Sequence, residues 1–176
     1  MGLSLQCGIM NNNRCGDIDP YIIFYLAEEA GMTLAEIKDM LQTKSGFYGM
    51  SGGISNDLRD IEQAADDGND DAANAIAAYA YSIKKYIGSY AAAMGGLDAI
   101  VFGGGIGRNS PTVRALSLSG LGFLGIELDG EKNRHAFGGR DISMPDSPVR
   151  IFVLDTDEEI IVARKAAALL ALDAQA

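Results

Sequence analysis

The chain has 176 residues, a hydrophobic fraction of 48% and a formal net charge of −10 at pH 7. This length suits one ordinary domain with a real hydrophobic core. The acidic balance argues against a nucleic-acid partner, since a phosphate backbone favours basic surfaces. A small phosphate ligand would need a local positive field, which makes the individual arginines informative.

The sequence also bears on where the protein works. It contains no apolar run of about 18 residues, and its first residues lack the charged and apolar regions of a secretory signal. We therefore expect a cytoplasmic protein without a membrane partner. Cys7 and Cys15 are too few for a disulfide framework, so we interpret them as reduced thiols.

The first part of the chain predicts helices separated by loops. An Asp-Pro pair at residues 19–20 supplies an N-cap and a first helical residue ahead of an apolar run. Thr33 and Glu36 have the spacing of a capping box for a second helix. We expect residues 45–55 to form a glycine-rich loop and residues 56–65 to form a short helix.

The middle of the chain has the strongest periodicity. Apolar residues recur at helical spacing over residues 76–94, and Gly95 follows as a stop signal. The segment "DAIVFGGG" then predicts a buried strand that enters a glycine turn. Residues 111–118 predict a short helix, with Asn109 or Ser110 as its cap.

The last part predicts one more strand and one more helix. The segment "PVRIFVLD" has strand composition, and Thr156 with Glu159 forms a capping-box pattern before an apolar C-terminal helix. Alternating strands and helices indicate an α/β domain. Without an internal repeat or a linker, residues 1–176 are interpreted as a single domain.

The segment "VFGGGIGRNSP" at residues 101–111 is open to two interpretations. A glycine turn between a strand and a helix exposes backbone N–H groups that favour phosphate. It lacks the Gly-Lys-Ser/Thr of a P-loop and the dinucleotide pattern G-x-G-x-x-G. The alternative is that the glycines only supply positive φ angles and close backbone contacts.

Charged residues near predicted loops have similar alternatives. Arg14 suits a carboxylate or phosphoryl group, but its spacing alone favours the alternative, a surface ion pair with Asp17 or Asp19. Asp57 has the position of a helix cap as well as of a ligand contact. Glu158 is available for a metal or water network, or compensates a helix dipole.

His135 is the single histidine, and no base–nucleophile pair surrounds it in the sequence. We interpret it as a surface or boundary residue. Neither a Ser-His-Asp set nor a Cys/His metal cluster can be assembled from the sequence.

Five segments together resemble the C-terminal half of acetate kinases, in that family's order and with similar spacings. They are "MGLSLQCGIMNNNRCGDIDP", "SGGISNDLRDIEQAADDGN", "YAYSIKKYIGSYAAAMGGLDAIVFGGGIGRNSPTVR", "GLGFLGIELDGEKN" and "DTDEEIIVARKA". The resemblance implies an α/β actin-like ATPase (ribonuclease H-like) domain of the acetate and sugar kinase/heat-shock/actin superfamily. It also implies Mg²⁺-dependent phosphoryl transfer between ATP and a short-chain carboxylate, which yields an acyl phosphate.

The resemblance assigns roles residue by residue. Arg14 matches the arginine that stabilises the transferring phosphoryl group, and Glu158 matches the family's magnesium-linked glutamate. The expected nucleotide-binding residues are Asp57, Leu58, Arg59, Gly105, Ile106, Gly107, Arg108 and Asn109. Mg²⁺ is thus the expected cofactor, and ATP or ADP the expected substrate.

The chain departs from the family pattern in three motifs. The usual "GTRSGD" is "NNRCGD" here, the usual "TAGIGEN" is "GGGIGRN", and the usual "TNEE" is "TDEE". Arg14 remains, but its neighbours are bulkier and more polar. Arg108 replaces an acidic residue, which would strengthen phosphate attraction or only alter a contact at the rim.

The resemblance begins in the middle of the family pattern, so we expect that the family's N-terminal domain, with most of the carboxylate pocket, is absent from this chain. One hypothesis is the nucleotide-binding half of an acetate kinase, inactive without a separate N-terminal half. Another is a non-catalytic nucleotide-binding or dimerisation module, with a homodimer formed through residues 79–94. A third is a structural α/β fragment without a ligand. The sequence does not distinguish acetate from propionate or butyrate.

Overall fold

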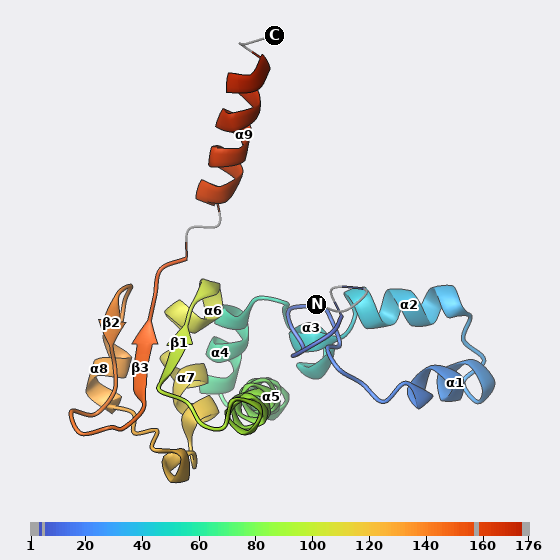
Figure 1. The fold of residues 1–176 in the computed structure, drawn as a ribbon. Coiled ribbons are helices and arrows are strands. Elements are labelled where there is room, and N and C mark those ends of the chain that lie inside the picture. Colours follow the sequence, from blue (N-terminus) through green and yellow to red (C-terminus); the bar gives the residue numbers. More distant parts are fainter. Residues whose placement is uncertain (1–3, 5, 157–158, 174–176) are drawn as a thin grey trace.

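The computed structural model of the chain describes residues 4, 6–156 and 159–173. A central body contains the sheet and most of the helices, and two parts project from it (Figure 1). One is an arm of two helices near the N-terminus, and the other is the C-terminal helix. The described elements confirm the expected α/β class, with many helices and a small mixed sheet.

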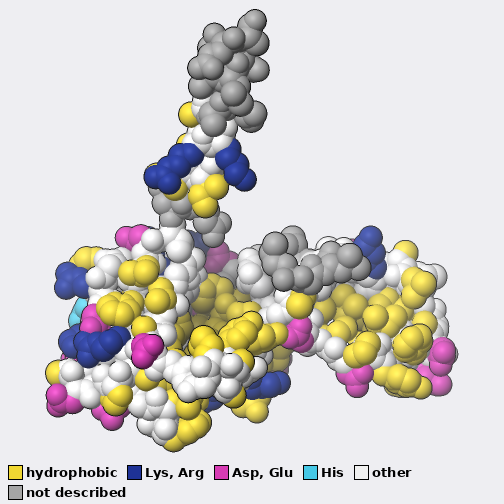
Figure 2. Space-filling view, viewed as in Figure 1, with side chains coloured by type: hydrophobic (Ala, Val, Ile, Leu, Met, Phe, Trp, Pro, Cys, Tyr) yellow, Lys and Arg dark blue, Asp and Glu magenta, His cyan; other side chains and the backbone are white. Residues whose placement is uncertain are grey.

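The arm consists of α1 (Tyr21–Glu28) and α2 (Leu34–Thr43). The capping box predicted for α2 is present, with reciprocal bonds between Thr33 and Glu36. Pro20 rather than Asp19 is the N-cap of α1, so the helix begins one residue later than predicted. The Asp19 carboxylate still accepts a hydrogen bond from the Tyr21 N–H. In Figure 2 hydrophobic side chains gather over this arm.

The prediction of a loop over residues 45–55 is partly wrong, because α3 (Gly46–Met50) forms there. Phe47 in this short helix is fully buried and packs against Tyr79 with the rings tilted, at 4.9 Å between ring centroids. Burial of an aromatic ring stabilises more than the local glycine content costs. Tertiary packing therefore overrides the local sequence signal.

The first hydrophobic core lies between α4 (Leu58–Asp66) and α5 (Asp70–Met94). Ala72 and Ala75 are fully buried, so the α5 backbone lies close to its neighbours. Gly95 ends α5 in the left-handed conformation, as predicted. The core is completed by Met10, Phe47, Leu58, Ile61, Ile76, Tyr79 and Val113.

The sheet has the strand order β1-β3-β2. Strands β1 (Ala99–Phe102) and β3 (Arg150–Val153) are parallel, with Ala99 opposite Arg150, and β2 (Arg140–Asp141) is antiparallel to β3. A second core, which includes Phe102 and Ile151, packs against this sheet.

The segments between β1 and β2 are mostly helical. They are α6 (Gly104–Asn109), α7 (Pro111–Leu118), the 3₁₀ turn η1 (Gly122–Leu124) and α8 (Gly130–Arg134). The predicted glycine turn is therefore itself a short helix. Ser110, not Asn109, caps α7 by accepting a hydrogen bond from the Val113 N–H.

The C-terminal helix α9 (Glu159–Asp173) extends away from the body (Figure 1). The capping box predicted for it spans residues 157 and 158, which lie outside the described residues. No helix in the described part of the chain is both long and apolar enough to cross a membrane. Cys7 and Cys15 are free thiols, and His135 is exposed at the surface, as predicted.

Candidate functional site

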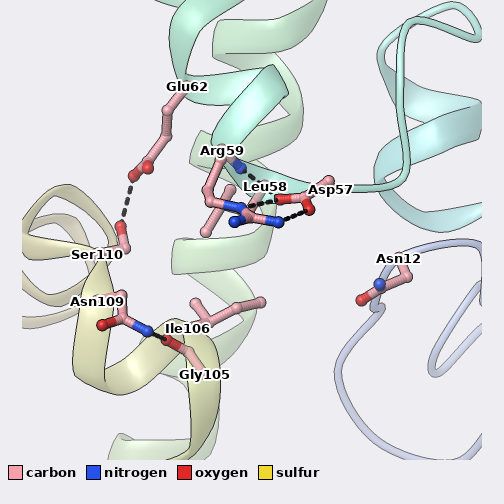
Figure 3. A pocket seen from close by; sticks show the side chains of 9 residues that line it. All are labelled: Asn12, Asp57, Leu58, Arg59, Glu62, Gly105, Ile106, Asn109 and Ser110. Atoms are coloured by element: carbon pink, nitrogen blue, oxygen red, sulfur yellow. Dashed lines mark hydrogen bonds and ion pairs between the residues drawn. The ribbon is translucent and has the colours of Figure 1, made fainter.

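A cavity of about 510 Å³ lies between the start of α4 and the α6–α7 junction (Figure 3). Nine residues line it: Asn12, Asp57, Leu58, Arg59, Glu62, Gly105, Ile106, Asn109 and Ser110. Six of these are among the eight residues that the sequence predicts for a nucleotide site, and Gly107 and Arg108 are the two outside the lining. Two segments some 45 residues apart in sequence therefore meet at one cavity.

The end of β1 places α6 at the cavity. Gly104 adopts φ +68, a left-handed conformation that favours glycine, and its N–H donates to the Thr156 hydroxyl at 3.1 Å. A Cβ on Gly103 would lie 3.0 Å from the Thr156 methyl group. These close contacts hold the start of α6 against Thr156, three residues after the end of β3. Gly103 and Gly104 thus have a structural role whether or not a ligand binds.

Asp57 and Arg59 form the other wall. Asp57 caps α4 by accepting a hydrogen bond from the Arg59 N–H, at 2.9 Å. It also accepts two bonds from the Arg59 guanidinium, Nε at 3.0 Å and Nη2 at 2.5 Å. These bonds lower the pKa of Asp57 to about 2 and raise the pKa of Arg59. Both residues therefore stay charged, and the guanidinium is held at the edge of the cavity.

Glu62 was not predicted, although it lies one helical turn after Leu58 on the cavity side of α4. The Ser110 hydroxyl donates to Glu62 Oε1 at 2.5 Å, which connects α4 to the cap of α7. Beside it, the Asn109 amide donates to the Gly105 carbonyl at 2.8 Å. The helical spacing from Leu58 was the available signal for Glu62.

Arg14 lies next to this cavity but not in its lining. It lines a separate hollow of about 440 Å³ with Asn12, Asn13, Gln42 and Thr43, and Asn12 lines both. The backbone of Arg14 closes a tight turn with Asn11, at 2.6 Å from N to O. The structure thus places the arginine beside the cavity, with Asn12 between them.

The asparagines that distinguish this turn from the family pattern have defined contacts. Asn12 adopts φ +28, which asparagine tolerates better than most residues. Asn13 accepts a hydrogen bond from the Asn56 amide at 2.7 Å, and its own amide donates to the Thr43 carbonyl at 2.8 Å. The turn that carries Arg14 is therefore tied to the segment just before α4.

Arg108 is not among the residues that line the cavity, and it forms an ion pair with Asp155, at 2.5 Å between Nε and Oδ1. Glu158, the predicted metal-linked residue, lies outside the described residues. Within the described part of the chain, no group of three or more His, Cys, Asp or Glu side chains could hold a metal ion.

The fold matches solved carboxylate kinases closely. The acetate kinase of Porphyromonas gingivalis superposes with a TM-score of 0.85 at 43% identity, over 93% of this chain and 41% of that one. A propionate kinase of Francisella tularensis gives 0.84 at 36% identity, over 93% and 41%. The fold is thus that of the acetate and propionate kinases, which confirms the expected actin-like ATPase class.

The sequence pattern of the Acetokinase family matches residues 1–164, and the chain belongs to this family. Among curated relatives, the acetate kinase of Halothermothrix orenii is 45% identical over 170 residues, which is 97% of this chain and 42% of the relative. The chain therefore spans about two fifths of the length of the curated relatives it matches.

Proposed function

We propose that this chain is the nucleotide-binding half of an acetate kinase-type phosphotransferase, a single domain equivalent to the C-terminal half of the family. The observation that carries the proposal is that Asp57–Arg59 meet Gly105, Ile106 and Asn109 at one cavity, although these residues, matched by family resemblance, come from distant segments of the sequence. The cavity then binds the nucleoside part of ATP or ADP. Its size lies within the ordinary range of ligand pockets.

The geometry suggests how the nucleotide lies. The apolar side chains of Leu58 and Ile106 and the held guanidinium of Arg59 suit a base and its ribose. The phosphates then extend past Asn12 toward the hollow of Arg14. Arg14 would neutralise charge on the transferring phosphoryl group, since this reaction depends on positioning and charge rather than on covalent help.

Mg²⁺ belongs to the proposal as the ion that accompanies the nucleotide phosphates. Magnesium keeps several waters and takes few protein carboxylates in such sites, so a dedicated three-residue cluster is not required. Glu158 is the proposed protein contact. When bound, the ion would neutralise phosphate charge.

The acceptor is proposed to be acetate or another short-chain carboxylate, bound largely by a separate N-terminal half. The named relatives include both acetate and propionate kinases, so the chain length of the acid stays open. Such an enzyme would work in the cytoplasm.

A second candidate is a non-catalytic nucleotide-binding or dimerisation module. It is favoured by the exposure of Tyr90 and Met94, which lie one helical turn apart on α5 and leave an apolar surface for a second copy. Tyr79 does not belong to that surface, because it is buried against Phe47.

Binding of Mg-ADP tests the nucleotide proposal. Millimolar Mg-ADP should raise the Tm of the chain, because a ligand that binds only the native state stabilises it. Asp57→Asn should weaken ADP binding about tenfold, while Asp39→Asn, which breaks an exposed ion pair on α2, should leave it unchanged. No rise in Tm at saturating Mg-ADP would contradict the proposal.

Activity separates the two candidates. The chain alone should form no acetyl phosphate from ATP and acetate, and activity should appear when a separately expressed N-terminal half of a family member is added. Arg14→Ala should then abolish turnover while ADP affinity stays within about twofold. ADP binding without activity under any such complementation would favour the non-catalytic module.

A further inference from the structure

Arg114 is the largest fully buried side chain in the described part of the chain. It lies on α7, and its guanidinium makes four hydrogen bonds. Nη1 donates to the carbonyls of Gly107 and Arg108, both at 2.8 Å. Nε and Nη2 donate to the side-chain and backbone oxygens of Asn133 on α8, both at 2.7 Å.

This is an unusual way to bury a cation. All four acceptors are carbonyl or amide oxygens, and the ion pairs found among the described residues do not include Arg114. Burial lowers the pKa of Arg114, as desolvation of a charge does. A buried charge is costly unless its hydrogen bonds are satisfied, so these contacts must be held in a fixed geometry.

Two of the four contacts fall on the last turn of α6. The final carbonyls of a helix have no partners within the helix, and a cation near them is favourable. With six residues, α6 is far too short to be stable as an isolated helix. Arg114 therefore ties the C-terminal end of α6 to α7 and α8, while Thr156 holds its beginning.

Asn133 completes the connection. Its side-chain amide donates to the Pro111 carbonyl at 2.9 Å, so the same residue orients the guanidinium and contacts the first turn of α7. Asn133 is itself buried. The cavity lining contributed by Gly105, Ile106 and Asn109 thus rests on a closed set of contacts behind it.

We propose that Arg114 is a positioning residue for the nucleotide, which sets affinity for ADP through the conformation of α6 without touching the ligand. The inference rests on the proposed nucleotide site. It predicts that the geometry of the guanidinium matters as well as its charge, because a lysine cannot reach two carbonyls and both Asn133 oxygens at once.

The test compares Arg114→Lys with Arg150→Lys. Arg150 also donates to two backbone carbonyls, those of Met144 and Pro145, but it lies at the start of the central strand β3 and does not line the cavity. Mg-ADP affinity is measured by calorimetry at a temperature where both variants are folded. We expect a loss of about tenfold or more for Arg114→Lys and less than twofold for Arg150→Lys.

Amide hydrogen exchange without nucleotide gives a second readout. Positioning predicts that residues 104–109 exchange faster in Arg114→Lys while α4 is unchanged, whereas a merely structural role would raise exchange throughout the body. If Arg114→Lys does not fold, Asn133→Ala, which removes one acceptor of the guanidinium, should lower ADP affinity several-fold.

These experiments distinguish failure of this inference from failure of the proposed function. A folded Arg114→Lys or Asn133→Ala with wild-type affinity overturns this inference and leaves the nucleotide site in place. A wild-type chain that does not bind Mg-ADP overturns the proposed function and this inference with it.

Discussion

Arg108 and Asp155 form an ion pair that joins the last turn of α6 to the second residue after β3. Strands β1 and β3 are parallel neighbours, so the segments that follow them emerge at the same edge of the sheet. A second contact at this edge is the hydrogen bond from the Gly104 N–H to Thr156. Because Arg108 replaces an acidic residue of the family pattern, the ion pair is a feature of this chain rather than of that pattern.

Arg108→Glu tests how much this ion pair contributes to the free energy of unfolding. Both side chains are about half exposed, so breaking it should cost no more than about 1 kcal/mol of unfolding free energy. The glutamate would also repel Asp155, and that repulsion should fade as salt screens it. Urea unfolding at low and at 1 M salt measures both effects. Lys44→Glu, which breaks the exposed pair with Asp39 on α2, is the matched control.

Because Arg108 lies outside the cavity lining, its substitution should change ADP affinity less than Asp57→Asn does. A tenfold loss of affinity in Arg108→Glu would show instead that Arg108 contacts the nucleotide.

Gly46→Ala should be strongly destabilising. Gly46 adopts φ +61, and a Cβ there would lie 2.3 Å from the Asn11 carbonyl oxygen and 2.9 Å from the Arg14 nitrogen. Strain at positive φ costs about 1–2 kcal/mol, and displacing the Arg14 turn adds to it. Gly31→Ala is the control, because Gly31 has φ +66 with nothing within 4 Å of the added Cβ.

The difference between the two glycine variants isolates the contact with the Arg14 turn. Thermal unfolding should give a loss of about 1–2 kcal/mol for Gly31→Ala and clearly more for Gly46→Ala. Equal losses of unfolding free energy in the two variants would mean that the Arg14 turn moves aside without a cost in stability.

Local patterns predicted much of this structure. The capping box of α2, the stop of α5 at Gly95 and both parallel strands follow from residues close together in sequence. The prediction that β1 is buried is wrong, because Ala99 and Val101 are exposed. The family resemblance added which residues face the cavity. The roles of Gly107 and Arg108 as nucleotide contacts stay predictions, as does Glu158, which lies outside the described residues.

The features that sequence reasoning missed depend on contacts between distant segments. Glu62 meets Ser110 across 48 residues, and Arg114 meets Asn133 across 19. Helix α3 forms because Phe47 packs on Tyr79, which no local pattern reveals. An arginine in a short helix of mixed composition also gives no sign in one sequence that it is fully buried.

Asp141 should make stability depend on pH in the acid range. Burial raises its pKa, but the hydroxyl and N–H of Ser143 and the guanidinium of Arg150 outweigh burial and lower the pKa to about 2. Since the folded pKa lies below the ordinary value, the carboxylate stabilises the fold at higher pH. That contribution is lost as the pH falls from about 4 through 2.

Asp141→Asn should therefore be less stable than the wild-type chain at pH 7, by on the order of 1 kcal/mol once solvent screening is allowed for. The gap should hold down to about pH 4.5 and narrow toward pH 2.5, because the Asp141 carboxyl of the unfolded wild-type chain then gains a proton and the folded carboxylate does not, which favours unfolding. Tm values of both proteins across this range measure the gap. Arg150→Gln removes the ion-pair partner of Asp141 and should raise the folded-state pKa of Asp141. The loss of stability should then be complete at a higher pH than in the wild-type chain. A gap that stays constant to pH 2.5 would show that the charge of Asp141 is not its source.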